Sequence, residues 1–236
     1  MRWMLSAALV ALGLPALAPA QQQNEAEKLF RAMEKQVREA KAIKVVFSVD
    51  GNLGKDMKVT AKGSVIVAEG NKARVELNAK QGDKDFKLQM YADGKVMGTL
   101  IDGKSGGKPS PVEPAMSEAI SQITTRGGIF VGMESSPEPG EKQKFDIEKF
   151  LPASDFKLGK KEMVNGREAQ VVTCTLKPRN GPALQMTVWL ATKGNLPIKR
   201  ELKASDKDAM LDVTENYSEF TLNPSLDAKI FEVPKQ

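Results

Sequence analysis

The chain has 236 residues, 41% of them hydrophobic, so it can bury a sizeable core, and mainly β chains of this length commonly fold as one domain. Its 35 lysines and arginines against 30 aspartates and glutamates make it mildly basic, without the clustered basic and aromatic side chains typical of a nucleic-acid surface. It contains no histidine, which excludes Ser-His and Cys-His nucleophile pairs and histidine-containing zinc sites.

The first 20 residues have the features of a cleaved export leader. Arg2 supplies an early positive charge, an apolar stretch runs from Met4 to Leu17, and Ala18, Pro19 and Ala20 fit the small-residue pattern that signal peptidase requires. The stretch is shorter than the roughly 20 apolar residues that span a bilayer, which favours a leader over a membrane anchor. We expect a periplasmic protein, cleaved after Ala20, with residues 21–236 as one domain and no transmembrane segment.

An amphipathic helix is predicted for residues 24–41. Leu29, Met33, Val37 and Ala40 recur every three to four residues, with charged side chains on the other face. Asn24 is the expected N-cap.

Strands follow, because the hydrophobic period changes to two residues. The alternating apolar positions are Val45, Phe47, Val49, Val59, Ala61, Val65, Val67, Ala73, Val75, Leu77, Ala79, Phe86, Leu88 and Met90. Residues 50–52, 69–71, 81–83 and 93–95 separate these strands and have the Gly, Asn and Asp composition of tight turns. Such short connections predict neighbouring antiparallel strands.

Residues 103–140 break this alternation with Gly, Pro and Ser. They include a helical stretch whose apolar face is Ala115, Met116, Ala119, Ile120 and Ile123, which we expect to be a lid over the sheet. Strands are predicted again near 156–158 and over 171–176, 184–190, 198–202 and 211–220. The predicted fold is mainly β (α+β): a curved antiparallel sheet of nine or ten strands forms an incomplete β-barrel, with the N-terminal and lid helices covering its concave apolar face.

Two features that could carry chemistry are interpreted as structural. Cys174 lies at strand spacing among apolar residues and is expected to be a buried small hydrophobe. The aspartate pairs 83/85 and 206/208 stand beside lysines in turns or strand ends, which favours solvated surface over a cation or acid-base site.

Residues 98–105 match the spacing of a phosphate-binding loop. That loop must lead directly into a helix, whereas residues 99–101 have the pattern of a strand and Pro109 and Pro111 follow. We therefore expect no nucleotide site, and we predict a protein that is not an enzyme and holds no cofactor or metal.

Several segments, in order over most of the chain, match the pattern of a known family: residues 26–34, 43–47, 93–95, 189–197, 199–200, 220–224, 226–227 and 230–234. The closing segment, from Phe220 to Pro234, is the most specific of them. Through these segments the chain resembles the periplasmic outer-membrane lipoprotein carrier (LolA-like) superfamily. The resemblance implies a non-enzymatic carrier whose apolar cavity receives the acyl chains of lipidated protein or free lipid, with a role in lipoprotein sorting or transport.

Apolar strand and helix positions are the predicted lining of that cavity, because flexible thioethers and aliphatic side chains suit ligands without a fixed shape. They are Val45, Phe47, Val49, Val65, Val67, Phe86, Leu88, Met90, Met116, Ile120, Ile123, Leu184, Met186 and Val188. The expected partners are lipoprotein acyl chains or lipid, and an inner- or outer-membrane protein.

One position departs from the family pattern. The resemblance implies an arginine that controls opening near the turn after the second or third strand, but this chain has Glu69 there. This departure favours the alternative that the chain is a regulatory or scaffolding envelope domain, which binds a protein partner instead of lipid.

Overall fold

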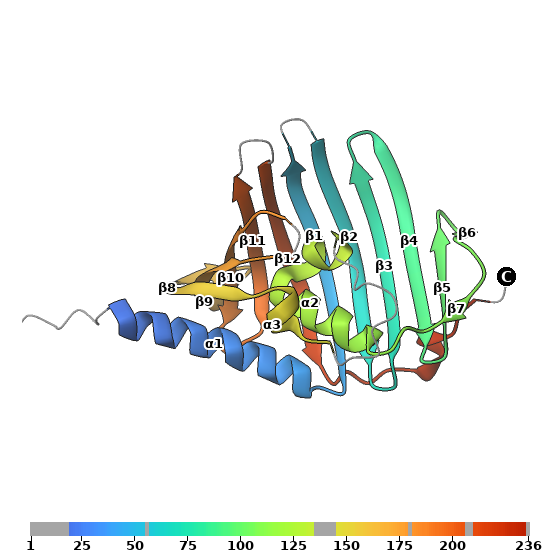
Figure 1. Cartoon of the computed structure of the whole chain (residues 1–236), viewed down its shortest axis with the longest axis horizontal. Helices are drawn as coiled ribbons and strands as arrows, with labels where there is room; N and C mark the ends of the chain where they lie inside the picture. Colours follow the sequence, from blue (N-terminus) through green and yellow to red (C-terminus); the bar gives the residue numbers. More distant parts are fainter. Residues whose placement is uncertain (1–18, 55–56, 135–144, 179–180, 206–209, 235–236) are drawn as a thin grey trace, which may run out of the picture.

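The computed structural model describes residues 19–54, 57–134, 145–178, 181–205 and 210–234. Within them, helices α1 (Pro19–Glu39), α2 (Met116–Glu134) and α3 (Ile147–Phe150) lie on one side of a large sheet (Figure 1). Its strands are β1 (Ala42–Leu53), β2 (Met57–Ala68), β3 (Lys72–Gln81), β4 (Lys84–Asp93), β5 (Val96–Ile101), β6 (Lys104–Ser105), β7 (Ser110–Pro111), β8 (Ala153–Val164), β9 (Arg167–Leu176), β10 (Leu184–Ala191), β11 (Pro197–Ser205) and β12 (Met210–Leu222).

The sheet is antiparallel and follows the order β6-β5-β4-β3-β2-β1-β12-β11-β10-β9-β8, with β7 beside β5. Chain neighbours pair through short turns, as predicted, and β1 pairs with β12 at the centre over a register from Ile43 and Leu222 to Leu53 and Leu211. In the described part of the chain the edges β6 and β8 do not meet. The predicted incomplete barrel is thus an open curved sheet.

Alternation along the strands separates the two faces of the sheet. In β1 every second residue from Ile43 to Val49 is buried in the core, and the residues between them are only half-buried. The concave face, which carries the helices, is therefore apolar, and the convex face is mostly polar.

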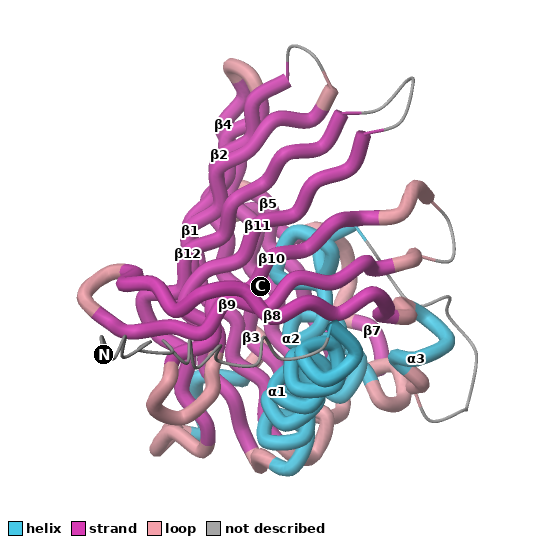
Figure 2. Tube along the Cα trace, turned by 90° about the vertical axis from the view of Figure 1, so that its left-hand side faces the viewer, coloured by secondary structure: helices cyan, strands magenta, loops and turns pink. Residues whose placement is uncertain are grey.

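Helix α1 runs beside β8 and packs its apolar stripe on the sheet (Figure 2). Its fully buried residues are Ala26, Phe30, Met33 and Val37, while Leu29 and Ala40 are half-buried. The helix begins at Pro19, so the prediction of Asn24 as N-cap was wrong. Proline suits a first helical position, because its fixed φ is already helical and its missing N–H has no partner in the first turn.

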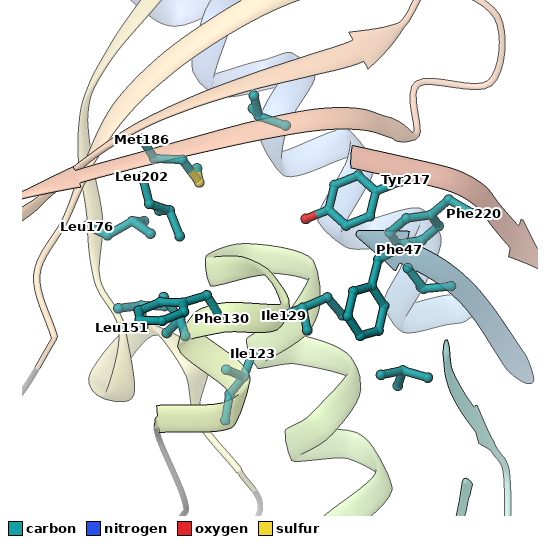
Figure 3. Packing of buried hydrophobic residues seen from close by; sticks show 14 of the residues in the cluster. Phe47, Ile123, Ile129, Phe130, Leu151, Leu176, Met186, Leu202, Tyr217 and Phe220 are labelled. Carbon is teal, nitrogen blue, oxygen red and sulfur yellow. The ribbon is translucent and has the colours of Figure 1, made fainter. Parts of the chain in front are cut away.

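Helix α2 is the predicted lid helix and is longer than the sequence pattern suggested. Ala119 and Ile123 are buried and Met116 and Ile120 half-buried, which confirms the apolar face. The helix then continues to Glu134 after a break at Gly128, where φ is 92° and ψ is −179°. The buried residues Ile129, Phe130 and Val131 lie beyond this break, and Figure 3 shows Ile129 and Phe130 on the side of α2 that faces strand residues such as Phe47 and Leu202.

Residues 98–105 form a hairpin and no phosphate-binding loop. β5 ends at Ile101, the turn places Asp102 and Gly103 at positive φ, and β6 begins at Lys104. Strand pairing of Leu100 with Ser105 closes the hairpin, as the strand pattern of residues 99–101 predicted.

Candidate functional site

The predicted lining residues lie on the concave side of the sheet and on α2, in two groups. The first group is buried in the core: Val45, Phe47, Val49, Val65, Val67, Ile123, Leu184, Met186 and Val188. The second group is more accessible: Leu88, Met90, Met116 and Ile120 are half-buried and Phe86 is exposed. Their role as a lining for ligand stays a prediction.

The helices cover only part of the concave face. In Figures 1 and 2 the strands β1 to β4 continue well past α1 and α2, toward the turns at their far end. Strand register places six apolar side chains there on the concave face, which we call the open-end strip: Leu53, Met57, Phe86, Leu88, Ile101 and Leu211. Leu53, Leu88 and Leu211 pack against the core, so the strip continues the apolar interior outward.

A buried ion pair holds α2 at its break. Arg200 on β11 and Glu215 on β12 are paired neighbours in the sheet and both are fully buried, with Arg200 Nη1 3.8 Å from Glu215 Oε2. Arg200 Nη1 and Nη2 donate to the backbone carbonyls of Thr124 and Thr125, at 3.1 and 2.7 Å. Arg200 therefore binds the carbonyl end of the first part of α2, which has no following helical turn to satisfy it.

Glu215 binds the other side of the break. Its carboxylate accepts hydrogen bonds from the backbone N–H groups of Ile129 at 3.0 Å and Phe130 at 2.7 Å. A carboxylate at a helix N-terminus is stabilised both by these hydrogen bonds and by the helix dipole. One ion pair of the sheet thus satisfies both helix ends that the break at Gly128 creates, and we call Arg200 and Glu215 the sheet clamp.

Tyr217 forms hydrogen bonds with both residues of the sheet clamp. Its hydroxyl donates to Glu215 and accepts from Arg200 Nη1 at 2.8 Å. Burial raises the pKa of Tyr217 well above its ordinary value, and the neighbouring Glu215 adds to this, so the hydroxyl keeps the proton it donates. Among the described residues Arg200 Nε has no hydrogen-bond partner, and a buried donor without a partner lowers the stability of this arrangement relative to a fully paired one.

A second buried arginine ties the helices to one another. Arg126, on α2, is 1% exposed and binds Glu34 of α1 through Nε at 2.5 Å and Nη2 at 3.0 Å. It also binds Glu148 of α3 and donates through Nη1 to the carbonyls of Ile147 and Leu151, at 3.2 and 3.0 Å. We call these contacts the helix clamp.

The helix clamp shifts the pKa of Arg126 and that of Glu148 in opposite directions. Burial by itself lowers the pKa of Arg126, but its hydrogen bonds to Glu148 and Glu34 more than compensate, and the pKa rises. The hydrogen bond from Arg126 lowers the pKa of the half-exposed Glu148 carboxyl. Both groups are held in their charged forms.

Neither clamp was predicted from the sequence. An opening arginine was expected near Glu69, which lies exposed between β2 and β3. The arginine that reaches the lid comes instead from β11, which is distant in sequence and adjacent to the lid only in the fold. The sequence did contain an indication of the break in α2: Gly127 and Gly128 stand side by side inside an apolar helical stretch, and such pairs commonly mark helix breaks.

A cavity of about 580 Å³ opens on the other, convex face of the sheet. Nine of its twelve lining residues have polar or charged side chains, among them Lys44, Lys62, Glu76, Asn78 and Asn216. Such groups would have to lose hydration to contact an acyl chain, so this cavity is not the candidate site for an apolar ligand.

Other chemistry-bearing residues lie apart from one another. Within the described ranges, no three His, Cys, Asp or Glu side chains come together as a metal site would require. Cys174 is buried, as predicted, and burial raises the pKa of its thiol to about 12. Asp83 and Asp85 are exposed, and the pair 206/208 and most of the leader lie outside the described residues. None of the helices in the described part of the chain combines the length and hydrophobicity needed to cross a membrane.

Comparison with solved structures shows which proteins share this fold. LprF from Mycobacterium bovis is 16% identical and matches 86% of this chain and 95% of its own, with a TM-score of 0.50. Lipoprotein LppX from Mycobacterium tuberculosis is 15% identical over 86% of this chain and 98% of its own, with a TM-score of 0.48. A LolA superfamily protein from Nitrosomonas europaea is 11% identical over 88% and 97%, with a TM-score of 0.34.

The chain thus has a fold similar to that of LprF. No family model matches the chain, and no curated protein matches it in sequence. At these identities the comparison shows similarity of fold only, and the function has to be inferred from the residues of this chain.

Proposed function

We propose that this chain is a non-enzymatic carrier of lipid or of lipidated protein in the cell envelope, whose acyl chains lie on the concave face of the sheet. The observation that carries the proposal is the open-end strip, because it extends the apolar interior beyond the helices to accessible side chains. Met57, Phe86 and Ile101 are 43%, 37% and 49% exposed. Covering such side chains with an acyl chain gains about 25 cal/mol per Å² of apolar surface removed from water.

The lid supplies the rest of the binding surface. If α2 moves from the sheet, the side chains of Ile129 and Phe130 leave positions in the core on the concave side of the sheet, which acyl chains could then occupy. The sheet clamp meets α2 through backbone groups only, so the contacts can re-form whenever the helix returns. This supports a lid that exchanges with ligand over a fixed sheet.

Export is part of the same proposal. Residues 1–20 would direct the chain to the periplasm and be removed after Ala20, which leaves the domain free to move between membranes. A carrier in an aqueous compartment must shield its cargo from water, and a concave apolar face under a helix offers this.

A charge on the strip tests the proposal. We expect Leu88→Asp to lower the affinity for a monomeric fluorescent fatty acid at least tenfold, because ligand binding would bury an unpaired carboxylate. The matched control is Asn78→Asp, which places the same charge on the exposed convex side of the neighbouring strand. Circular dichroism checks that both variants fold.

Two results would refute the carrier function. The first is wild-type protein that takes up no fatty acid and, in native mass spectrometry after gentle isolation from its own envelope, carries no lipid or acylated peptide. The second is equal uptake by folded Leu88→Asp and Asn78→Asp. Either would favour the alternative of a domain that binds a protein partner.

A further inference from the structure

The exposed apolar residues of the open end each have a lysine beside them. Lys58 follows Met57, and Lys87 follows Phe86. Across the β5 to β6 hairpin, Ile101 pairs directly with Lys104. Met57 and Phe86 lie on the concave face near the far end of β2 and β4, and Lys58 and Lys87 lie beside them on the convex face. The β5 to β6 hairpin, with Ile101 and Lys104, turns lower on the sheet (Figure 1).

The part of this end that is formed by β2 to β6 carries a net positive charge. Residues 57–60, 80–88 and 101–104 contain five lysines and three aspartates, Asp83, Asp85 and Asp102. Within the described part of the chain none of these lysines forms an ion pair. Asp102 is occupied by a hydrogen bond of 2.7 Å from the backbone N–H of Lys87. The ammonium groups are therefore free to meet anions.

We propose that the open end docks on the surface of an anionic phospholipid bilayer. Apolar side chains that enter the headgroup region, with lysines that extend toward lipid phosphates, are the combination that binds such surfaces. The inference rests on the proposed function, since the docked strip would give acyl chains an apolar path from bilayer to interior. The occupant is a lipid surface because the apolar residues lie at the strand ends, where a flat surface can reach them.

Vesicle flotation of the mature chain tests the docking. We expect binding to vesicles of phosphatidylcholine mixed with phosphatidylglycerol, little binding to phosphatidylcholine alone, and a loss of binding as salt rises. Each basic residue near an anionic surface contributes about fivefold in affinity. Lys58→Glu with Lys87→Glu should therefore weaken binding at least about 25-fold, and Phe86→Ser should weaken it independently of salt.

The matched control is Lys160→Glu with Lys193→Glu. It changes net charge equally, but Lys160 lies on β8 and Lys193 in the turn before Asn195, which contacts α1. Equal loss in both double variants, or equal binding to neutral vesicles, would overturn the docking. A Phe86→Ser variant that binds like the wild type would overturn the insertion of apolar side chains.

A soluble fatty acid separates this inference from the carrier function. Both double variants should take up the monomeric probe like the wild type, because none of their lysines belongs to the apolar face. Vesicle binding without uptake of the probe would refute the carrier and keep the docking. Uptake without vesicle binding would refute the docking and keep the carrier.

Discussion

At the scale of single residues, the lid depends on charges buried where the sequence has no obvious functional pattern. Arg200 and Glu215 are both 0% exposed, and together they satisfy four backbone groups of α2. Gly128 makes this geometry feasible, because a Cβ there would lie 2.4 Å from Glu215 Oε2 and 2.7 Å from Arg200 Nη1. The break in α2 and the ion pair beneath it therefore require one another.

We expect replacement of one partner of the sheet clamp to lower the free energy of unfolding more than replacement of both. We expect Arg200→Met to lower the free energy of unfolding by about 3–5 kcal/mol, since Glu215 stays buried without its counter-charge. Adding Glu215→Gln should restore part of this loss, because the amide oxygen can still accept one hydrogen bond from α2. Urea denaturation of the single and double variants measures the difference. A double variant less stable than Arg200→Met would contradict this account of the clamp.

At the scale of elements, the helix clamp joins α1 to the successive helices α2 and α3, from which it is separated in sequence by strands β1 to β7. Arg126 binds Glu34 of α1 and Glu148 of α3, while Arg31 of α1 reaches the same Glu148 at 2.8 Å. Four residues form only about one turn, so α3 depends on contacts beyond its own backbone hydrogen bonds. The buried side chains of Ile147 and of the adjacent Leu151 provide one part of these contacts, and the ion pairs provide another part, which depends on pH.

Acid should loosen α3 and α2 before the sheet. The pKa of Glu148 is below its ordinary value of 4.5 in the folded protein, so its contribution is fully present above about pH 4.5 and is lost as the pH falls through the lowered value. Hydrogen exchange of amides in 116–131 and 147–151, followed from pH 6 downward, should show this opening. In Glu148→Gln the additional loosening should vanish, and an unchanged acid response in that variant would refute the assignment.

At the scale of the whole molecule, the chain after β12 fastens one half of the sheet to the other. Residues 223–234 run from the end of β12 past β3 and β4 toward β5, with the short 3-10 helix η1 (Ala228–Phe231) on the way (Figure 1). Phe231 is 3% exposed, Arg74 donates to the carbonyl of Ile230 at 3.2 Å, and Val233 packs on Gly98. This gives a physical reason for the most specific segment of the family resemblance.

Removing the anchor of this segment should destabilise the entire sheet. Phe231→Ala is expected to lower the free energy of unfolding by about 3–5 kcal/mol, the usual loss for a buried phenylalanine. The exposed neighbour Lys229→Ala should change it by less than about 0.5 kcal/mol. Urea midpoints measure both. If the two variants unfold at the same urea concentration, the segment does not fasten the sheet.

The strands, and the side of each strand that is buried, could be predicted from the sequence alone. Period-two alternation such as Val45, Phe47 and Val49, with turn residues between the runs, fixes which side of each strand is buried, because side-chain direction alternates by covalent geometry. The sequence likewise predicted the lid helix from the spacing of Ala119 and Ile123, and Cys174 as a core residue. These are local properties, and local patterns suffice for them.

Two features could not be predicted from the sequence, because they depend on tertiary contacts: the contacts that hold α2 on the sheet, and the part of the apolar face that the helices leave uncovered. Arginine and glutamate are residue types usually found at the surface, but Arg200 and Glu215 are buried because β11 and β12, which are distant in sequence from α2, bring their charges to the helix ends at its break. The open-end strip likewise depends on where the helices stop covering the strands (Figure 2). Ion pairs such as these, and the covering of one element by another, join residues that are far apart in sequence. A short stretch of sequence therefore cannot predict them.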